Sequence, residues 1–364
     1  MKNLHQRLTS KLRQREKGGN LRSLKSYSGY TDFFSNDYLG FGNSIQFDTI
    51  HSNNVGSSRL IAGTTDLHLQ LEEYCAGLFQ NGKSLLFNSG YSANLGVLSS
   101  LPQKDDVILY DERSHASIKD GVRLSLAKGI KFKHNDFSDL SNKLIKNSQS
   151  TVFVVIESLY SMDGDFAPLQ EIYNICEKYQ AYLIVDEAHS GGVFGENGSG
   201  YCAEKNIKPF LKLITFGKAF GANGACVVGD ATTIDYLVNY SRPFIYTTAL
   251  SSNDTSLILQ QLKRTDYKIK QDKLQSIIAY FNDKFDRFSI QSDSISPIKS
   301  IVFRDRSTLR SLETELHKQK IGVKAIYAPT VPENQERLRI SLHAFNTFEE
   351  VDRLYTVIEK HEID

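Results

Sequence analysis

The chain has 364 residues, of which 40% are hydrophobic and 23% are charged, and its formal net charge is +1. This length suits one large domain and one smaller domain. The near-zero net charge argues against a nucleic-acid or anionic-membrane partner. No run of about 18 apolar residues is present, so we expect no transmembrane helix. The polar N-terminus and four widely spaced cysteines predict a cytoplasmic protein with free thiols and no metal site.

The first two thirds of the chain alternate between helical and strand patterns. In chain order we expect a helix over 2–16, a helix over 66–78, a strand over 84–87, a helix over 91–101, a strand over 106–110, a helix over 114–127, a strand over 151–156, a helix over 169–179, and strands over 182–185 and 212–215. Strands that alternate with helices predict a parallel sheet with helices on both faces.

The pattern changes after about residue 250, where longer amphipathic helices flank short strands. The expected helices cover 270–288, 307–319 and 347–360, and the strands lie near 299–303 and 337–341. This pattern predicts an α+β C-terminal domain. We therefore divide the chain into an N-terminal segment (1–44), a large α/β domain (45–248) and a C-terminal domain (249–364).

The segment ITFGKAFGANGA (214–225) sets Lys218 between Gly217 and Gly221 after an apolar strand. Most lysines at strand ends are exposed to solvent, but the small residues around this one let a flat ring approach the backbone. A Walker A loop would require glycine at position 212 and Ser or Thr at position 219. These positions hold lysine and alanine instead. The segment therefore favours a Schiff-base lysine that binds pyridoxal 5′-phosphate (PLP).

The segment LIVDEAHSGGVFG (183–195) places Asp186 at the carboxyl end of a buried strand, where open α/β sheets bind ligands. A buried carboxylate needs a cation, and the protonated ring nitrogen of PLP is such a cation. His189 is placed to hydrogen-bond the phenolic oxygen of the ring. The alternative for Asp186 is a turn-capping role. The Asp-Glu-Ala-His string also resembles a helicase Walker B motif, but the required P-loop is absent.

Further candidates follow other predicted strands. Gly90 and Tyr91 begin a helix whose backbone N–H groups suit a phosphate, and Thr215 offers a hydroxyl to the same group. His115 is suited to stack on a ring and to transfer protons, although a structural histidine is the commoner case. Ser161, which lies with Glu157 beyond another buried strand, is a weaker cofactor-binding candidate. Their shared position after strands predicts one site at the carboxyl edge of the sheet.

Six strings resemble, in order, the α-oxoamine synthases, which are fold-type I PLP enzymes. They are SNDYLG (35–40), SHAS (114–117), SMDGD (161–165), VDEAH (185–189), TFGKAFG (215–221) and RLRISL (337–342). The resemblance extends over about residues 30–360. It implies a large domain with a mostly parallel seven-stranded sheet, a smaller α+β C-terminal domain and a homodimer whose site is built across two subunits.

The resemblance also implies roles around the cofactor. Lys218 would carry PLP, Asp186 would pair with the ring nitrogen, and His115 would stack on the ring as a third catalytic residue. The other implied cofactor contacts are His189, Ser161, Gly90, Tyr91 and Thr215, with Thr247 or Thr248 reaching the phosphate of the neighbouring subunit.

The implied substrate contacts come from both ends of the chain. Arg339 would bind the substrate carboxylate with help from Asn36, and Ser341 and Arg13 would touch the acyl substrate. The segment GSSRLIAG (56–63) is poorer in glycine than is usual in the family. This departure leaves the acyl partner open.

Members of this family condense an amino acid with an acyl thioester and release CO2 and a thiol. Within the family, this chain is most similar to the members that join L-alanine to pimeloyl-CoA or a pimeloyl-carrier protein in biotin biosynthesis. The alternatives are a glycine C-acetyltransferase, a sphingoid-base-type synthase, and a fold-type I enzyme of another reaction class such as an aminotransferase.

Overall fold

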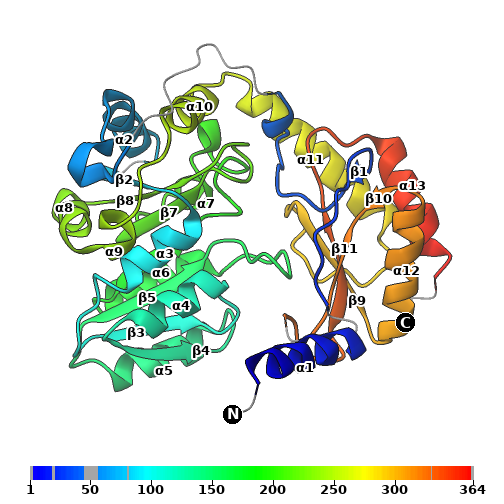
Figure 1. Cartoon of the computed structure of the whole chain (residues 1–364), viewed down its shortest axis with the longest axis horizontal. Coiled ribbons are helices and arrows are strands. Elements are labelled where there is room, and N and C mark those ends of the chain that lie inside the picture. Colours follow the sequence, from blue (N-terminus) through cyan, green and yellow to red (C-terminus); the bar gives the residue numbers. More distant parts are fainter. Residues whose placement is uncertain (1–2, 19–20, 45–55, 80–81, 329, 362–364) are drawn as a thin grey trace.

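The structure is a computed structural model that describes residues 3–18, 21–44, 56–79, 82–328 and 330–361. Its strands form a seven-stranded sheet, a three-stranded sheet and a two-stranded pair. Figure 1 shows the large sheet with its helices on the left and the small sheet with its helices on the right. The functional candidates lie where these two parts face each other.

The large sheet has the strand order β2-β8-β7-β6-β5-β3-β4. Its strands are β2 (Lys83–Phe87), β3 (Val107–Asp111), β4 (Lys128–Phe132), β5 (Val152–Glu157), β6 (Tyr182–Asp186), β7 (Leu211–Thr215) and β8 (Ala225–Gly229). Neighbouring strands from β7 to β4 are parallel, whereas β8 is antiparallel to both of its neighbours. The expected mostly parallel seven-stranded sheet is confirmed.

The antiparallel strand β8 was missing from the prediction, which assumed that consecutive strands run in parallel. After β7 the chain reverses in the loop 216–224 and returns directly beside β7 as β8. Because β8 separates β2 from β7 and is antiparallel to both, β2 and β7 point the same way. The carboxyl ends of β2, β3, β5, β6 and β7 therefore share one edge, as the site prediction required.

Helices cover both faces of the large sheet, as expected. One face packs on α3 (Gly90–Leu98), α4 (Ala116–Leu124), α8 (Ala231–Tyr240) and α9 (Arg242–Ile245). The other face packs on α5 (Phe137–Lys146), α6 (Leu169–Lys178), α7 (Tyr201–Glu204), α2 (Asp66–Leu78) and α10 (Ser252–Leu262). The central strand β5 is buried along its whole length, which explains its continuous apolar sequence.

The smaller domain is built on the antiparallel sheet β11-β12-β9, as the α+β prediction required. Its strands are β9 (Ile298–Phe303), β11 (Lys324–Ile326) and β12 (Glu336–Ser341), and its long helices are α11 (Tyr267–Lys284), α12 (Arg306–Lys318) and α13 (Phe348–Glu359). The N-terminal segment joins this domain, because β1 (Thr31–Asp32) pairs in parallel with β10 (Ile321–Gly322).

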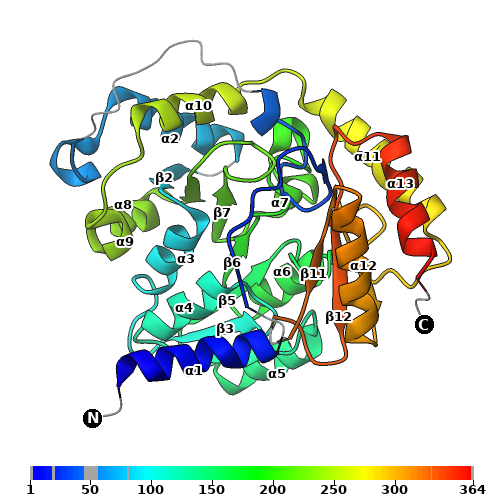
Figure 2. The ribbon, with the colours of Figure 1, turned by 45° about the vertical axis from the view of Figure 1, so that its right-hand side comes forward.

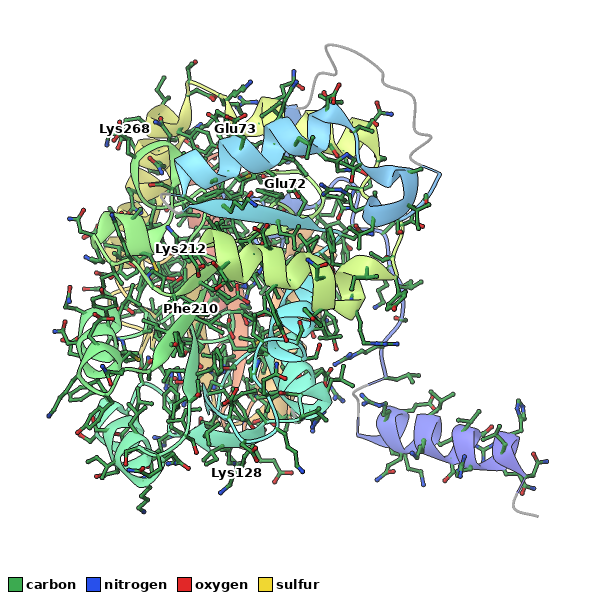
Figure 3. All side chains as sticks on the ribbon, turned by 90° about the vertical axis from the view of Figure 1, so that its left-hand side faces the viewer. Glu72, Glu73, Lys128, Phe210, Lys212 and Lys268 are labelled. Atoms are coloured by element: carbon green, nitrogen blue, oxygen red, sulfur yellow. The ribbon has the colours of Figure 1, made fainter. Side chains whose placement is uncertain are left out.

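Two regions bear on the expected boundaries. Helix α1 (Leu4–Lys17) buries none of its residues, and Figure 3 shows it standing apart from the rest of the chain. The boundary expected at residue 248 falls between α9 and α10, and α10 packs against α2 of the large domain. The boundary expected at residue 44 adjoins residues 45–55, which lie outside the described part of the chain. Within the described residues, no helix combines the length and apolar character that crossing a membrane requires.

Candidate active site

A cavity of about 450 Å³ opens at the carboxyl edge of the large sheet and is closed on its other side by β11 and β12. Most of the predicted site residues line it. They are Asn36, Gly90, Tyr91, His115, Ser161, Asp186, His189, Thr215, Lys218 and Arg339. Their convergence confirms that the motifs meet in one place.

Lys218 enters this cavity from the loop that joins β7 to β8. Gly221 closes the turn behind it with a hydrogen bond from its N–H to the Lys218 carbonyl, and its φ of 63° suits glycine. Nζ of Lys218 lies 3.0 Å from Nε2 of His189. Burial lowers the pKa of Lys218 to about 8, although nearby carboxylates favour the charged form. A larger share of the amine is therefore neutral and nucleophilic near neutral pH.

His189 connects Lys218 to a tyrosine that the sequence prediction did not include. Its Nδ1 lies 2.7 Å from the hydroxyl of Tyr38, which is fully buried. Burial and the charge of Lys218 hold the pKa of His189 well below its ordinary value. Burial also raises the pKa of Tyr38 to about 12. Both side chains therefore stay neutral at physiological pH, and they form an uncharged hydrogen-bonded pair beside the lysine.

Asp186 ends strand β6 and is only 5% exposed. Its Oδ1 accepts a hydrogen bond from the backbone N–H of Ala188 at 2.9 Å, and its Oδ2 accepts one from Nδ2 of Asn94 at 2.7 Å. Asn94 also donates to Ser117 Oγ at 3.0 Å. Both carboxylate oxygens are therefore oriented by the protein, and the group lines the cavity.

The N-terminus of α3 forms a seat for an anion at the same edge. Ser89 caps this helix by accepting a hydrogen bond from the N–H of Ser92 at 3.1 Å. A Cβ added to Gly90 would lie 2.4 Å from Cγ2 of Thr215, so a larger residue here would displace the Thr215 side chain. The helix N-terminus favours a phosphate through its free N–H groups and its dipole.

His115 caps the N-terminus of α4 and reaches the cavity from the strand β3 side. Its Nδ1 lies 2.8 Å from Ser117 Oγ, and its backbone N–H donates to Glu157 Oε1 at 2.5 Å. Burial lowers the pKa of His115. Burial, followed by the charge of Asp186, raises the pKa of Glu157 to about 8. The imidazole is therefore neutral, which suits stacking on a ring.

Arg339 enters from β12 of the smaller domain and is held by three protein contacts. Its Nε donates to the Ser161 carbonyl at 2.6 Å, its Nη1 to Ser341 Oγ at 2.8 Å and its Nη2 to Asn36 Oδ1 at 3.0 Å. A guanidinium has five N–H donors, so one N–H on each Nη atom is left for a substrate carboxylate. The planar fork matches that group in a way that lysine does not.

Four predicted residues do not line this cavity. Ser341 is buried behind Arg339 and contacts it directly. Thr247 and Thr248 line a separate small cavity with Asn88 and Phe244. Arg13 lies on the exposed helix α1. The expected contacts of Thr247, Thr248 and Arg13 with a neighbouring subunit or an acyl substrate stay predictions.

Three residues of the cavity network had no predicted role. Tyr38 lies within the SNDYLG string, Asn94 lies one helical turn after Gly90, and Glu157 directly follows the predicted strand 151–156. The spacing of Asn94 from Gly90 is the one signal that could have been used, since residues four apart share a helix face. Tyr38 could not be found in this way, because its partner is 151 residues away.

The comparison with family models matches residues 28–358 to the aminotransferase class I and II family. The chain belongs to this family. Among its curated relatives is the 8-amino-7-oxononanoate synthase of Emericella nidulans, which is 39% identical over 91% of this chain and 89% of its own length. The predicted resemblance to α-oxoamine synthases is confirmed by such relatives.

Solved structures of family members agree with the fold. The 8-amino-7-oxononanoate synthase of Francisella tularensis has a TM-score of 0.75 at 32% identity, covering 91% of this chain and 97% of its own. A serine palmitoyltransferase solved with PLP has a TM-score of 0.86 at 25% identity, covering 97% of this chain and 96% of its own. The fold-type I prediction is therefore confirmed.

Proposed function

We propose that this protein is a PLP-dependent α-oxoamine synthase that condenses L-alanine with a pimeloyl thioester. The products are 8-amino-7-oxononanoate, CO2 and the free thiol, which places the reaction in biotin biosynthesis. The observation that carries the proposal is the convergence of Lys218, Asp186 and the N-terminus of α3 on one cavity. The relatives named 8-amino-7-oxononanoate synthase, at 34–39% identity, support the choice of substrates.

The residues of the cavity fit the chemical groups of PLP. Lys218 would supply the amine for its aldehyde, Asp186 the carboxylate for its ring nitrogen, and His189 a neighbour for its phenolic oxygen. Thr215 and the open backbone beside Gly90 suit its phosphate. When bound, PLP supplies an electron sink for the negative charge that develops at the substrate Cα.

The protein's own side chains then position the substrate and move the proton. Arg339 orients the amino-acid carboxylate with the N–H donors that its three protein contacts leave over. The amine of Lys218, when free, removes the Cα proton, which its lowered pKa of about 8 favours near neutral pH. His115 would lie against the ring face and would help to keep water away from the reacting carbon. Asp186 would favour the protonated form of the ring nitrogen.

We also propose that the enzyme is a cytoplasmic homodimer. Its four cysteines are all free and buried, as expected for a protein of a reducing compartment. Thr248 is exposed, so its side chain is open to contact with a neighbouring subunit, and its carbonyl accepts a hydrogen bond from Nδ2 of Asn88 at 2.8 Å. Sedimentation equilibrium of the holoprotein tests the dimer, and a monomer at working concentration would contradict it.

The test of the function begins with the purified holoprotein. Borohydride reduction followed by peptide mapping should find the cofactor on the peptide that contains Lys218. Lys218→Ala should lose the visible absorbance and lower turnover by about 10²- to 10⁴-fold or more. Lys208→Ala changes an exposed lysine elsewhere and serves as the control. A reduced cofactor on any other lysine would overturn the assignment.

The substrates are tested by supplying L-alanine and pimeloyl-CoA together. Release of CO2 and free thiol in equal amounts supports the proposed reaction. The likeness to serine palmitoyltransferases favours, as a second candidate, a synthase that uses L-serine and a long acyl thioester. A panel of alanine, glycine and serine against short, dicarboxylic and long acyl-CoA donors separates the two.

A further inference from the structure

The wall of the cavity that belongs to the smaller domain carries two cations on neighbouring strands. Lys324 of β11 is paired in register with Arg339 of β12 in the antiparallel sheet. Side chains of such a pair lie on the same face of a sheet, with their Cβ atoms about 4.5–5.5 Å apart. Both residues line the cavity that contains Lys218. Figure 2 shows β11 and β12 side by side, facing the large domain.

This pairing is unfavourable for the sheet itself. Like charges directly opposite each other on neighbouring strands destabilise a sheet. Lys324 is partly balanced by Glu313, whose Oε1 lies 3.2 Å from its Nζ, but the lysine side chain is 56% exposed. An ion pair at such an exposed position stabilises by about 0–1 kcal/mol. The lysine is therefore free to exchange this partner for an anion in the cavity.

The proposed reaction brings two carboxylates into the cavity. Arg339 is assigned to the carboxylate of the amino acid, and the amine of Lys218 is used by the cofactor and the proton transfer. Lys324 is the remaining lysine or arginine among the described residues that line the cavity. A dicarboxylic acyl thioester brings a second carboxylate at its far end, which has no cation assigned to it.

Apolar side chains lie on the same wall of the cavity. Phe34, Met162 and Ile326 all line it, and none of them is exposed beyond an intermediate degree. Ile326 follows Lys324 by two residues on β11, so the two side chains share one face of the strand. Phe34 packs against Gly322, where an added Cβ would lie 2.3 Å from its ring. The methylene chain of an acyl substrate that packed on this wall would lead to Lys324.

We propose that Lys324 binds the distal carboxylate of the acyl substrate while its methylene chain packs on Phe34, Met162 and Ile326. This inference rests on the proposed function and adds to it a residue that selects a dicarboxylic over a monocarboxylic acyl group. Lys324 does not touch the reacting atoms. It is a specificity-determining residue.

The test compares two donors that differ only at the far end of the acyl chain. Pimeloyl-CoA ends in a carboxylate, and heptanoyl-CoA has the same number of carbons and ends in a methyl group. Lys324→Met keeps the length of the side chain and removes its charge. We expect it to raise KM for pimeloyl-CoA by about tenfold, as for the loss of one charged hydrogen bond. The kcat/KM for heptanoyl-CoA should stay equal or increase.

Two further variants sharpen the measurement. Lys324→Arg keeps the charge and should retain most of the preference for pimeloyl-CoA. Lys318→Met removes another exposed lysine, which is paired with Glu315 at 3.7 Å on α12, and should change the kinetics of neither donor. The visible absorbance of each holoprotein should match that of the unsubstituted protein, which confirms that the cofactor site is intact.

The outcomes separate this inference from the proposed function. If Lys324→Met lowers kcat/KM equally for both donors, the lysine either binds the phosphates of coenzyme A, which both donors contain, or only stabilises the fold. The inference is then overturned. If the unsubstituted holoprotein binds PLP but does not use pimeloyl-CoA, the proposed function itself fails. A selective loss with pimeloyl-CoA, retained preference in Lys324→Arg and an unchanged Lys318→Met would support the inference.

Discussion

Nδ2 of Asn94 lies 2.7 Å from Oδ2 of Asp186, although the two residues are 92 positions apart in the chain. The amide comes from helix α3, whose N-terminus forms the anion seat, and the carboxylate comes from the end of β6. This contact therefore links the helix that we propose for the phosphate of the cofactor to the carboxylate that we propose for its ring nitrogen.

Asn94→Leu removes this donor while keeping a similar volume. A hydrogen bond to a charged group contributes about 1.5–3 kcal/mol, so we expect the affinity for PLP to fall by about 10- to 100-fold. Titration of the cofactor-stripped protein with PLP, followed by visible absorbance, measures this. Asn239→Leu removes an exposed amide on α8 and should leave the affinity unchanged. An unaltered affinity in Asn94→Leu would mean that the contact between Asn94 and Asp186 does not contribute to PLP binding.

Gly90 and Gly77 offer a matched pair of helical glycines. A Cβ at Gly90 would lie 2.4 Å from Thr215 Cγ2, whereas a Cβ at Gly77 would meet nothing within 4 Å. We expect Gly90→Ala to displace Thr215 and to weaken PLP binding by at least about tenfold. Gly77→Ala should leave binding unchanged and stabilise the protein by about 0.4–1 kcal/mol. Equal PLP affinity in both variants would contradict the seat beside Gly90.

The pKa of Lys218 predicts how the cofactor-stripped protein captures PLP. Burial lowers this pKa to about 8 from an ordinary value of 10.5. Because the neutral amine is the nucleophile, the rate of capture should rise with pH and level off above about pH 8. Stopped-flow absorbance after mixing with PLP measures the rate. A rate that keeps rising toward pH 10 would show that the amine behaves like one in water.

The sequence predicted five of the seven strands of the large sheet and the helices α11, α12 and α13, but it missed β4, β8 and the helices α5, α8 and α10. The edge strand β4 was missed because four of its five residues are exposed or only partly buried, so no apolar run marks it. The strand β8 was missed because it follows a glycine-rich turn and pairs with β7 in the antiparallel direction. Periodicity indicates that a strand exists, but only pairing decides its direction.

Some site residues could likewise be predicted from sequence patterns, and others depend on contacts between distant parts of the chain. Motifs that follow strands could be brought together from sequence, because the carboxyl ends of aligned strands meet at one edge. Tyr38 and Lys324 could not be placed in this way, since each depends on how the smaller domain and the N-terminal segment dock beside the large sheet. Thr247 and Thr248 were assigned to the phosphate of a neighbouring subunit, and such contacts cannot be seen in a single chain.

His134 joins two loops of the active-site edge through a pair of carboxylates. Its Nδ1 lies 2.9 Å from Asp111 Oδ1, and its Nε2 lies 2.7 Å from Asp165 Oδ2. Asp111 precedes the turn that carries His115, and Asp165 ends the loop that carries Ser161. Burial disfavours the charged imidazole, but the two carboxylates outweigh it and raise the pKa of His134 to about 9.

A raised pKa in the folded state makes the contribution of His134 to stability depend on pH. The contribution is complete below the unfolded value of 6.5 and is lost as the pH rises through about 9. After allowance for solvent screening it amounts to about 1–3 kcal/mol. The free energy of unfolding of the native protein, measured in urea, should therefore exceed that of His134→Gln at pH 6 and converge with it above pH 9. A difference that stays constant over this range would show that the imidazole is neutral and acts only through its shape.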